Sequence, residues 1–215
     1  MLKLGPHTKR LTVRGDRIFA PINDLLIILS ALAHATSIMV GGSTHTTEDP
    51  VLRVTTRWPD YGFGLPLRGP LEHALSAKTP LAIEIAIIAD KSALQEPLHN
   101  IKHQTPGLQA TLAHVISPIF LMFFERYNDW LDATYGDAKN WPATLNFSRV
   151  VRNSIAHGKI KIRNPAAPSV RWRDLEYGYK DNGHQIIGSD IKLGEMVALI
   201  FDVSDALDSL NAPLL

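Results

Sequence analysis

The chain has 215 residues, of which 45% are hydrophobic, and a formal net charge of only +1. This is enough apolar material for one sizeable core, and we predict a single domain over residues 1–215. The balanced charge excludes a polycation, so nucleic-acid binding requires a local basic patch. The chain contains no cysteine, which excludes disulfides, thiolate nucleophiles and cysteine-rich zinc sites and agrees with a cytoplasmic protein.

The first forty residues predict a basic lead-in followed by a helix. Residues 1–20 are interrupted by glycine and proline and indicate an irregular or short-stranded segment. Asn23 or Asp24 is suited to cap a helix that continues to about residue 40. The apolar run 25–40 is shorter than the roughly 20 residues of a membrane span and contains serine, threonine and histidine. We therefore expect a buried core helix and no membrane contact.

Residues 43–70 are rich in threonine, glycine and proline, and the one β-like piece among them is 51–58. We predict a long inserted loop that contains one strand at most. Its aromatic residues Trp58, Tyr61 and Phe63 have two possible roles. They either pin the loop to the body of the protein, which we favour, or stack on nucleic-acid bases.

Two helices are predicted next, a short one at 71–77 and a longer one at 81–103. The longer one carries His99 and His103, which are four residues apart. A metal site would need a third ligand, and no acidic residue is in register with the two histidines. We interpret them as a solvent-facing pair near a helix end.

The longest helical pattern covers residues 108–135 and is mostly apolar in its first half. Pro118 within it favours a bend. A helix this apolar has to pack on several neighbours. Its large residues are therefore expected in the core and not around a cofactor: Met122, Phe123, Phe124 and Trp130. A further helix is predicted at 143–157, directly after a proline suited to a helix start.

Apolar and basic residues alternate after this helix. Short β-like pieces at 160–163, 170–173 and 185–187, and a hairpin-type turn at 181–183, predict a small sheet or ribbon within the tract 159–188. A last helix should run from about residue 190 to 210. Its buried side is expected to contain Met196, Leu199, Ile200, Val203, Leu207 and Leu210. The fold class expected for the whole chain is mainly α.

The stretch that ends at Gly158 is the one place where the sequence indicates chemistry. Each helical residue turns by roughly 100°, so Arg149, Asn153 and His157 share one face, with Arg152 on its flank. Apolar residues fall on the other side. Glycine readily adopts the left-handed conformation of a helix stop. The pattern predicts a helix that buries one side and presents a polar, basic face on the other.

The sequence Arg152-Asn153-Ser-Ile-Ala-His157, followed by Gly158, resembles the motif of the HEPN superfamily: an arginine, an adjoining polar residue, and a histidine after four intervening positions. The resemblance implies an up-and-down bundle of about four to five helices that pairs as a homodimer with the motif helices facing each other. The 43–70 insertion and the 159–188 tract depart from the simplest bundle. Many members are metal-independent endoribonucleases of toxin–antitoxin, abortive-infection and CRISPR systems, and others keep the fold without cleaving RNA.

RNA cleavage of this kind requires few protein groups, because the 2′-OH of the RNA is the nucleophile. His157 is suited to act as general acid or base near neutral pH. Arg152 stabilises the anionic transition state, and Asn153 orients the imidazole or holds a phosphate oxygen. One helix supplies one histidine, and a two-fold dimer supplies the second. No metal and no cofactor is expected.

Basic residues are concentrated directly around the motif. Residues 149–173 contain seven basic residues and no acidic one, whereas from 174 to 208 acids outnumber bases eight to two. The simplest interpretation of such a tract is a solvated surface. In an RNA-binding protein it would neutralise phosphates independently of sequence. The residues expected to do so are Arg149, Lys159, Lys161 and Arg163.

Three hypotheses follow. In the first, the protein is a cytoplasmic, homodimeric endoribonuclease, a toxin or defence effector with an antitoxin or other protein partner, that leaves a 2′,3′-cyclic phosphate through Arg152, His157 and Asn153. In the second, a non-catalytic HEPN-like dimer uses the same groove to bind a nucleotide, an RNA or a protein. In the third, the motif is accidental and its charges are solvated, with His157 favoured by the dipole at a helix C-terminus.

Overall fold

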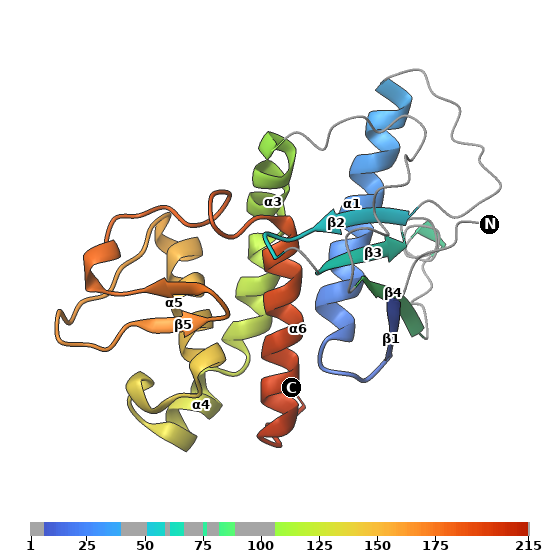
Figure 1. The fold of residues 1–215 in the computed structure, drawn as a ribbon. Helices are drawn as coiled ribbons and strands as arrows, with labels where there is room; N and C mark the ends of the chain where they lie inside the picture. The colour runs from blue at the N-terminus through green and yellow to red at the C-terminus, as the bar shows by residue number, and fades with distance from the viewer. Residues whose placement is uncertain are drawn as a thin grey trace. The chain divides into compact units, whose positions relative to one another are not determined.

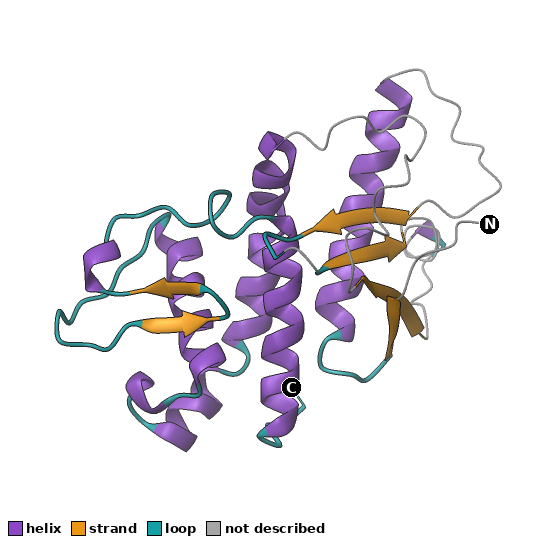
Figure 2. Cartoon of the chain, viewed as in Figure 1, coloured by secondary structure: helices purple, strands orange, loops and turns teal. Residues whose placement is uncertain are grey.

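The computed structural model of the chain describes residues 7–39, 51–58, 61–66, 75–76, 82–88 and 106–214. The chain divides into two compact units, Met1–His103 and Gln104–Leu215, where the sequence led us to expect one domain (Figure 1). Helices hold most of the regular structure in the described ranges, which agrees with a mainly helical chain (Figure 2). Within those ranges no helix is long and apolar enough to cross a bilayer.

The N-terminal unit contains helix α1 (Phe19–Met39) and a four-stranded antiparallel sheet. The strands are β1 (His7–Val13), β2 (Val51–Thr55), β3 (Gly62–Pro66) and β4 (Ala82–Ile88), in the order β1-β4-β3-β2. The basic lead-in thus contributes an edge strand, β1, which pairs with β4 along its whole length. The first and last strands described in this unit are therefore hydrogen-bonded neighbours.

Helix α1 is the core helix that the sequence predicts, and it begins earlier than Asn23. The carboxylate of Asp16 accepts a hydrogen bond from the backbone N–H of Val13 at 2.7 Å, and the carbonyl of Asp16 accepts one from the N–H of Phe19 at 3.0 Å. This turn leads the chain directly from β1 into the helix. The buried residues of α1 include Ile22, Leu25, Leu26 and Leu29.

The prediction of a helix at 81–103 is wrong for the first part of this range, which forms strand β4. Ile83 and Ile85 are buried while Glu84 between them is exposed, the two-residue period of a strand. In sequence this alternation is hidden by a nearly continuous apolar run, and β-branched isoleucines favour a strand once β1 and β3 are present to pair with it. The remainder of that prediction, with His99 and His103, and most of the 71–77 helix lie outside the described residues.

The 43–70 insertion is not simply a loop, because its described parts form the hairpin of β2 and β3. The β-like piece at 51–58 was predicted, but β3 was hidden by its glycines and prolines. At the turn, the hydroxyl of Thr56 donates to the carbonyl of Tyr61 at 2.8 Å. Tyr61 makes edge contacts with the rings of Trp58 and Phe63, and Phe63 is fully buried. The burial of Phe63 agrees with the pinning role for that residue, whereas Trp58 and Tyr61 are only half-buried.

In the C-terminal unit, helices α3 (Pro106–Glu125), α5 (Ala143–His157) and α6 (Leu193–Ser209) contact one another. The predicted helix 108–135 is divided into α3 and α4 (Asn128–Tyr135) at a turn closed by a hydrogen bond from the N–H of Tyr127 to the carbonyl of Phe124. Phe123 and Phe124 are buried as expected, but Met122 is 65% exposed and was wrongly assigned to the core. Buried residues of the last helix, α6, include five of those predicted: Met196, Leu199, Ile200, Val203 and Leu207.

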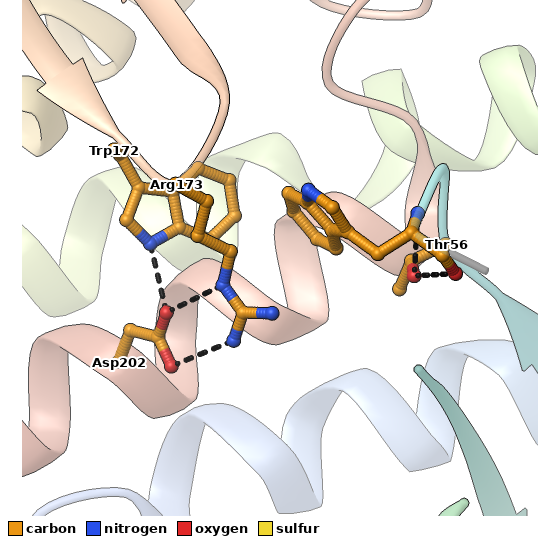
Figure 3. Close-up of polar contacts among 5 residues, drawn as sticks. Thr56, Trp172, Arg173 and Asp202 are labelled. Carbon is orange, nitrogen blue, oxygen red and sulfur yellow. Dashed lines mark hydrogen bonds and ion pairs between the residues drawn. The ribbon is translucent and has the colours of Figure 1, made fainter. Parts of the chain in front are cut away.

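A two-stranded ribbon of β5 (Val170–Trp172) and β6 (Leu175–Tyr177) precedes α6. Its turn is at Arg173, which has a positive φ of 53°, and not at 181–183, where the chain instead leaves the short helix η3 (Tyr179–Asp181). Asp202 of α6 accepts hydrogen bonds from Trp172 Nε1 at 2.8 Å and from Arg173 Nε and Nη2 at 3.0 and 3.2 Å (Figure 3). One carboxylate thus fastens the ribbon turn to α6 and offsets the strain at Arg173.

We expect Asp202→Ala to lower the free energy of unfolding by about 1–3 kcal/mol, because it removes the carboxylate that accepts hydrogen bonds from the indole N–H and the guanidinium. Asp202→Asn keeps an oxygen that can accept from the indole and should lose less. Chemical denaturation followed by tryptophan fluorescence measures both. Equal losses in the two variants would contradict this account of the ribbon turn.

Candidate functional site

Helix α5 presents the motif as the sequence predicts. It runs from Ala143 to His157, and Gly158 ends it in the left-handed conformation with a φ of 72°. One side of the helix is buried and comprises Leu145, Phe147, Ser148, Val150, Val151 and Ser154. Phe147 packs against the rings of Trp172 and Tyr177, at centroid distances of 5.4 and 5.5 Å, so this side also contacts the β5–β6 ribbon. The motif residues occupy the other, more exposed side.

The exposed side of α5 forms one wall of a groove with a volume of about 730 Å³. We call it the motif groove. The segment that leads into α5 and the chain after it provide the other walls. The polar residues that line it are Asp137, Lys139, Asn146, Arg149, Arg152, Asn153, His157, Lys161, Arg163 and Asn164.

Arg152 is held on two sides. Its Nε and Nη2 form a hydrogen bond and an ion pair with the same carboxylate oxygen of Glu125, at the end of α3. Its Nη1 donates to the Oδ1 of Asn153 at 2.8 Å. The two contacts fix the plane of the guanidinium at the wall of the groove. They also place one negative charge beside the motif arginine.

Arg149 is held within its own helix. Its Nε and Nη2 donate to the Oδ1 of Asn146 at 3.1 and 3.0 Å. Burial lowers the pKa of the Arg149 guanidinium, while attraction to the carboxylates of Asp137 and Asp132 opposes that effect. Arginine nonetheless stays protonated in proteins. Arg149 therefore brings a positive charge whose hydrogen-bond partner is neutral.

The carboxylate of Asp137 lies on the opposite rim, before the short helix η2 (Ala138–Asn140). It accepts a hydrogen bond from the backbone N–H of Lys139 at 3.1 Å. This backbone hydrogen bond is the main reason that the pKa of Asp137 lies below its ordinary value, with a smaller contribution from the Lys139 charge. Asp137 is thus ionised throughout the neutral range and reduces the positive charge of that rim.

The basic chain after Gly158 is extended, although only part of the predicted β-like tract is strand. Ile160 exchanges backbone hydrogen bonds with the 183–184 segment, at 2.9 and 3.1 Å. The side chain of Asn182 accepts from the N–H of Ile162 at 2.6 Å and donates to its carbonyl at 2.8 Å, so an amide takes the place of a partner strand. Ile160 is buried, whereas the alternate residues Lys159, Lys161 and Arg163 are exposed.

Most of the predicted site residues are thereby brought together. Arg149, Arg152, Asn153, His157, Lys161 and Arg163 all line the motif groove. Lys159 instead lines a second hollow, which shares part of its lining with the motif groove. Asn146 was not predicted, although its spacing of three residues from Arg149 places it on the same helix face. Glu125 was not predicted either, and no local signal indicates it because it is 27 residues from Arg152.

Across the described residues, no three histidine, aspartate or glutamate side chains come together in a way that could hold a metal ion. Comparisons of the chain with protein-family models, with curated proteins and with solved structures found no match. The chemistry of the motif groove is therefore argued from its own side chains.

We predict that Glu125→Gln loosens the side chain of Arg152 with little effect on stability, below about 1 kcal/mol, because the ion pair is partly exposed. The measurement is the Nε–Hε signal of each arginine in a ¹H–¹⁵N spectrum. Solvent exchange at Arg152 should accelerate. Arg149 is the internal control, since its Nε–H donates to Asn146, and its signal should not change. Unchanged exchange at Arg152 would mean that Glu125 does not hold it.

Proposed function

We propose that the protein is a metal-independent endoribonuclease of the HEPN type. One observation carries the proposal: Arg152, Asn153 and His157 line a single groove together with Lys161 and Arg163. The groove thus combines an imidazole, a fixed guanidinium and further cations. These are the groups that transesterification of a phosphodiester requires.

The proposed reaction begins when a histidine takes the proton of the RNA 2′-OH. The 2′ oxygen then bonds to the adjacent phosphorus, and the bond from phosphorus to the 5′ oxygen breaks. A protonated histidine gives its proton to that leaving oxygen. The products are a 2′,3′-cyclic phosphate and a 5′-hydroxyl, and neither an oxidant nor a metal takes part. His157 is assigned the proton transfers, for which its exposure at the end of α5 gives it access.

Arg152 is assigned the stabilisation of the crowded phosphorane anion. Its contacts with Glu125 and Asn153 support this role, because a preorganised donor does not have to be reoriented during the reaction. Asn153 acts through Arg152 and is thus a positioning residue in this scheme. Arg149, Lys161 and Arg163 contribute phosphate contacts, and Lys159 extends the basic surface beyond the groove.

The proposal includes a homodimer in which His157 takes a proton and the partner's His157 gives one. Each protomer would contribute a helical bundle of the HEPN type, and the mutual contacts of helices α3, α5 and α6 support this part of the proposal. A cytoplasmic toxin or defence effector, controlled by an antitoxin or another protein, is the biological role that fits such an activity.

A second function is favoured by one specific contact. Glu125 neutralises Arg152, and a phosphate that approaches this guanidinium also meets the carboxylate. The same groove could thus serve a non-catalytic dimer that binds RNA or a nucleotide through Arg149, Lys161 and Arg163. Binding of RNA without cleavage would distinguish this function from the first.

We expect the purified protein to cleave RNA in the presence of EDTA and to leave 2′,3′-cyclic phosphate ends. His157→Ala should lower the rate by about 10²–10⁴-fold, the usual contribution of a general acid or base. Arg152→Ala should lower it by about 10²–10³-fold, as for other transition-state donors.

The matched control is His184→Ala, since His184 is also an exposed histidine of the C-terminal unit and bonds Asp190 at 3.0 Å outside the motif groove. This variant should retain full activity. Cleavage that survives in His157→Ala would come from a contaminant or from other residues. RNA left intact by the wild type while it is bound would favour the second function.

We expect a mass in solution of twice the 23.8 kDa of the chain, with the motif helices of the two protomers in contact. The absence of native cysteine allows a simple test by oxidative cross-linking of single-cysteine variants. Ala156→Cys, on the exposed end of α5, should form a covalent dimer, which requires Cα atoms within about 7 Å. Ala133→Cys, exposed on α4, should not. A monomer, or the reverse cross-linking pattern, would contradict the composite site.

A further inference from the structure

A second hollow of about 680 Å³ adjoins the motif groove, and the two share His157, Lys161, Ile162 and Arg163 as lining residues. A ligand that occupies the groove at His157 can therefore continue into the hollow. The hollow adds Lys159 and Tyr179 to this shared wall. The proposed function gives Lys159 a place on the basic surface but assigns no role to Tyr179.

Tyr179 is unusual among the described residues. It is 46% exposed and is the only aromatic among the large hydrophobic residues that are exposed in those ranges. Other aromatic rings of the C-terminal unit, such as Phe147, Tyr177 and Trp172, pack on one another in the core. An exposed ring at the edge of a hollow leaves an apolar face available to a ligand.

The backbone under this ring is held firmly. Tyr179 opens η3, whose turn is closed by hydrogen bonds of Asp181: its carboxylate accepts from the N–H of Gly178 at 2.7 Å, and its own N–H donates to the Gly178 carbonyl at 3.0 Å. The N–H of Asn182 donates to the carbonyl of Tyr179 at 3.2 Å. Asn182 in turn fastens this segment to Ile162, directly beside Lys161 and Arg163. The backbone of Tyr179 is thus held at a fixed place relative to the extended chain that follows α5.

The charges around the ring select the chemistry of its ligand. Lys159, Lys161 and Arg163 are exposed and line the same hollow, so a cationic ligand would be repelled and an anionic one attracted. A flat aromatic group joined to a phosphate satisfies both the ring and the cations. That combination is a nucleotide.

We propose that Tyr179 stacks an unpaired base of the nucleotide next to the phosphate held in the motif groove. This inference rests on the proposed function for the assignment of the groove to RNA, and it names the form of RNA that is accepted. A base inside a duplex has both faces covered by its neighbours and cannot reach the ring. The substrate is therefore unpaired on at least one side of the reactive phosphate.

The test measures binding of a fluorescein-labelled, fully 2′-O-methylated RNA hexamer in EDTA, since this probe cannot be cleaved by 2′-OH attack. Tyr179→Ala should weaken binding roughly 5- to 100-fold, the usual effect of losing one stacked base, whereas Tyr179→Phe should retain it. Lys180→Arg changes the exposed neighbouring side chain of η3 but keeps its charge, so it is the matched control and should leave the affinity of the hexamer unchanged within about twofold. The same hexamer in a duplex should bind more weakly, and Tyr179→Ala should not alter that binding.

Abasic hexamers separate stacking from a structural effect. The wild type should bind a hexamer more weakly when the base that stacks on Tyr179 is absent. Tyr179→Ala should bind the hexamers with and without that base equally well. Coupling of this kind does not arise from a damaged fold. Equal loss in both proteins at every position, or no binding of the hexamer by the wild type, overturns the inference. If cleavage depends on His157 but no coupling is found, the endoribonuclease proposal is supported and the base site is overturned. If coupling is found without cleavage, the base site is supported in a non-catalytic protein.

Discussion

The packing of α5 against α3, α6 and β5 sets the direction in which each motif residue points. Leu145, Phe147 and Val151 are fully buried, so the helix has no freedom to rotate without exposing them. At roughly 25 cal/mol per Å² of apolar surface, exposure of even one such side chain would cost a few kcal/mol. The rotation of the helix therefore fixes Arg149, Arg152 and His157 on the side of the groove. In the proposed endoribonuclease, positions for catalysis are a consequence of core packing.

The charge of its hydrogen-bond partner determines how readily each cation of the groove can bind a phosphate. Glu125 fixes the direction of the Arg152 guanidinium, which suits a donor that acts on charge developing in a transition state, while its carboxylate opposes an anion that approaches the same group. Arg149 bonds the neutral amide of Asn146, while Lys161 and Arg163 extend from a chain held by Asn182. The groove thus combines one guanidinium of fixed orientation with several cations suited to bind a phosphate backbone. The acidic residues after 174 do not line the groove, since its only acidic lining residue is Asp137.

Local patterns were predictive where the relevant interactions are close in sequence. Helix α5, its stop at Gly158 and the polar face of the motif follow from residues within a few turns of one another. The alternation of Ile160 with exposed cations was also visible, although its partner segment was not. Strand β4 shows the opposite case. Its apolar run suits a helix or a buried strand equally, and only pairing with β1 and β3 decides between them.

The sequence by itself determined the motif helix, its two faces, the mainly helical character of the chain and the lack of any thiol chemistry, because these depend on residue type and short-range periodicity. Tertiary structure alone decided the four-stranded sheet of the N-terminal unit, the contact of Glu125 with Arg152, the clamp of Asn182 on Ile162 and the exposed ring of Tyr179 beside His157. Each of these depends on residues about 20 or more positions apart, whose meeting is fixed by packing and chain topology and leaves no periodic signal in the chain.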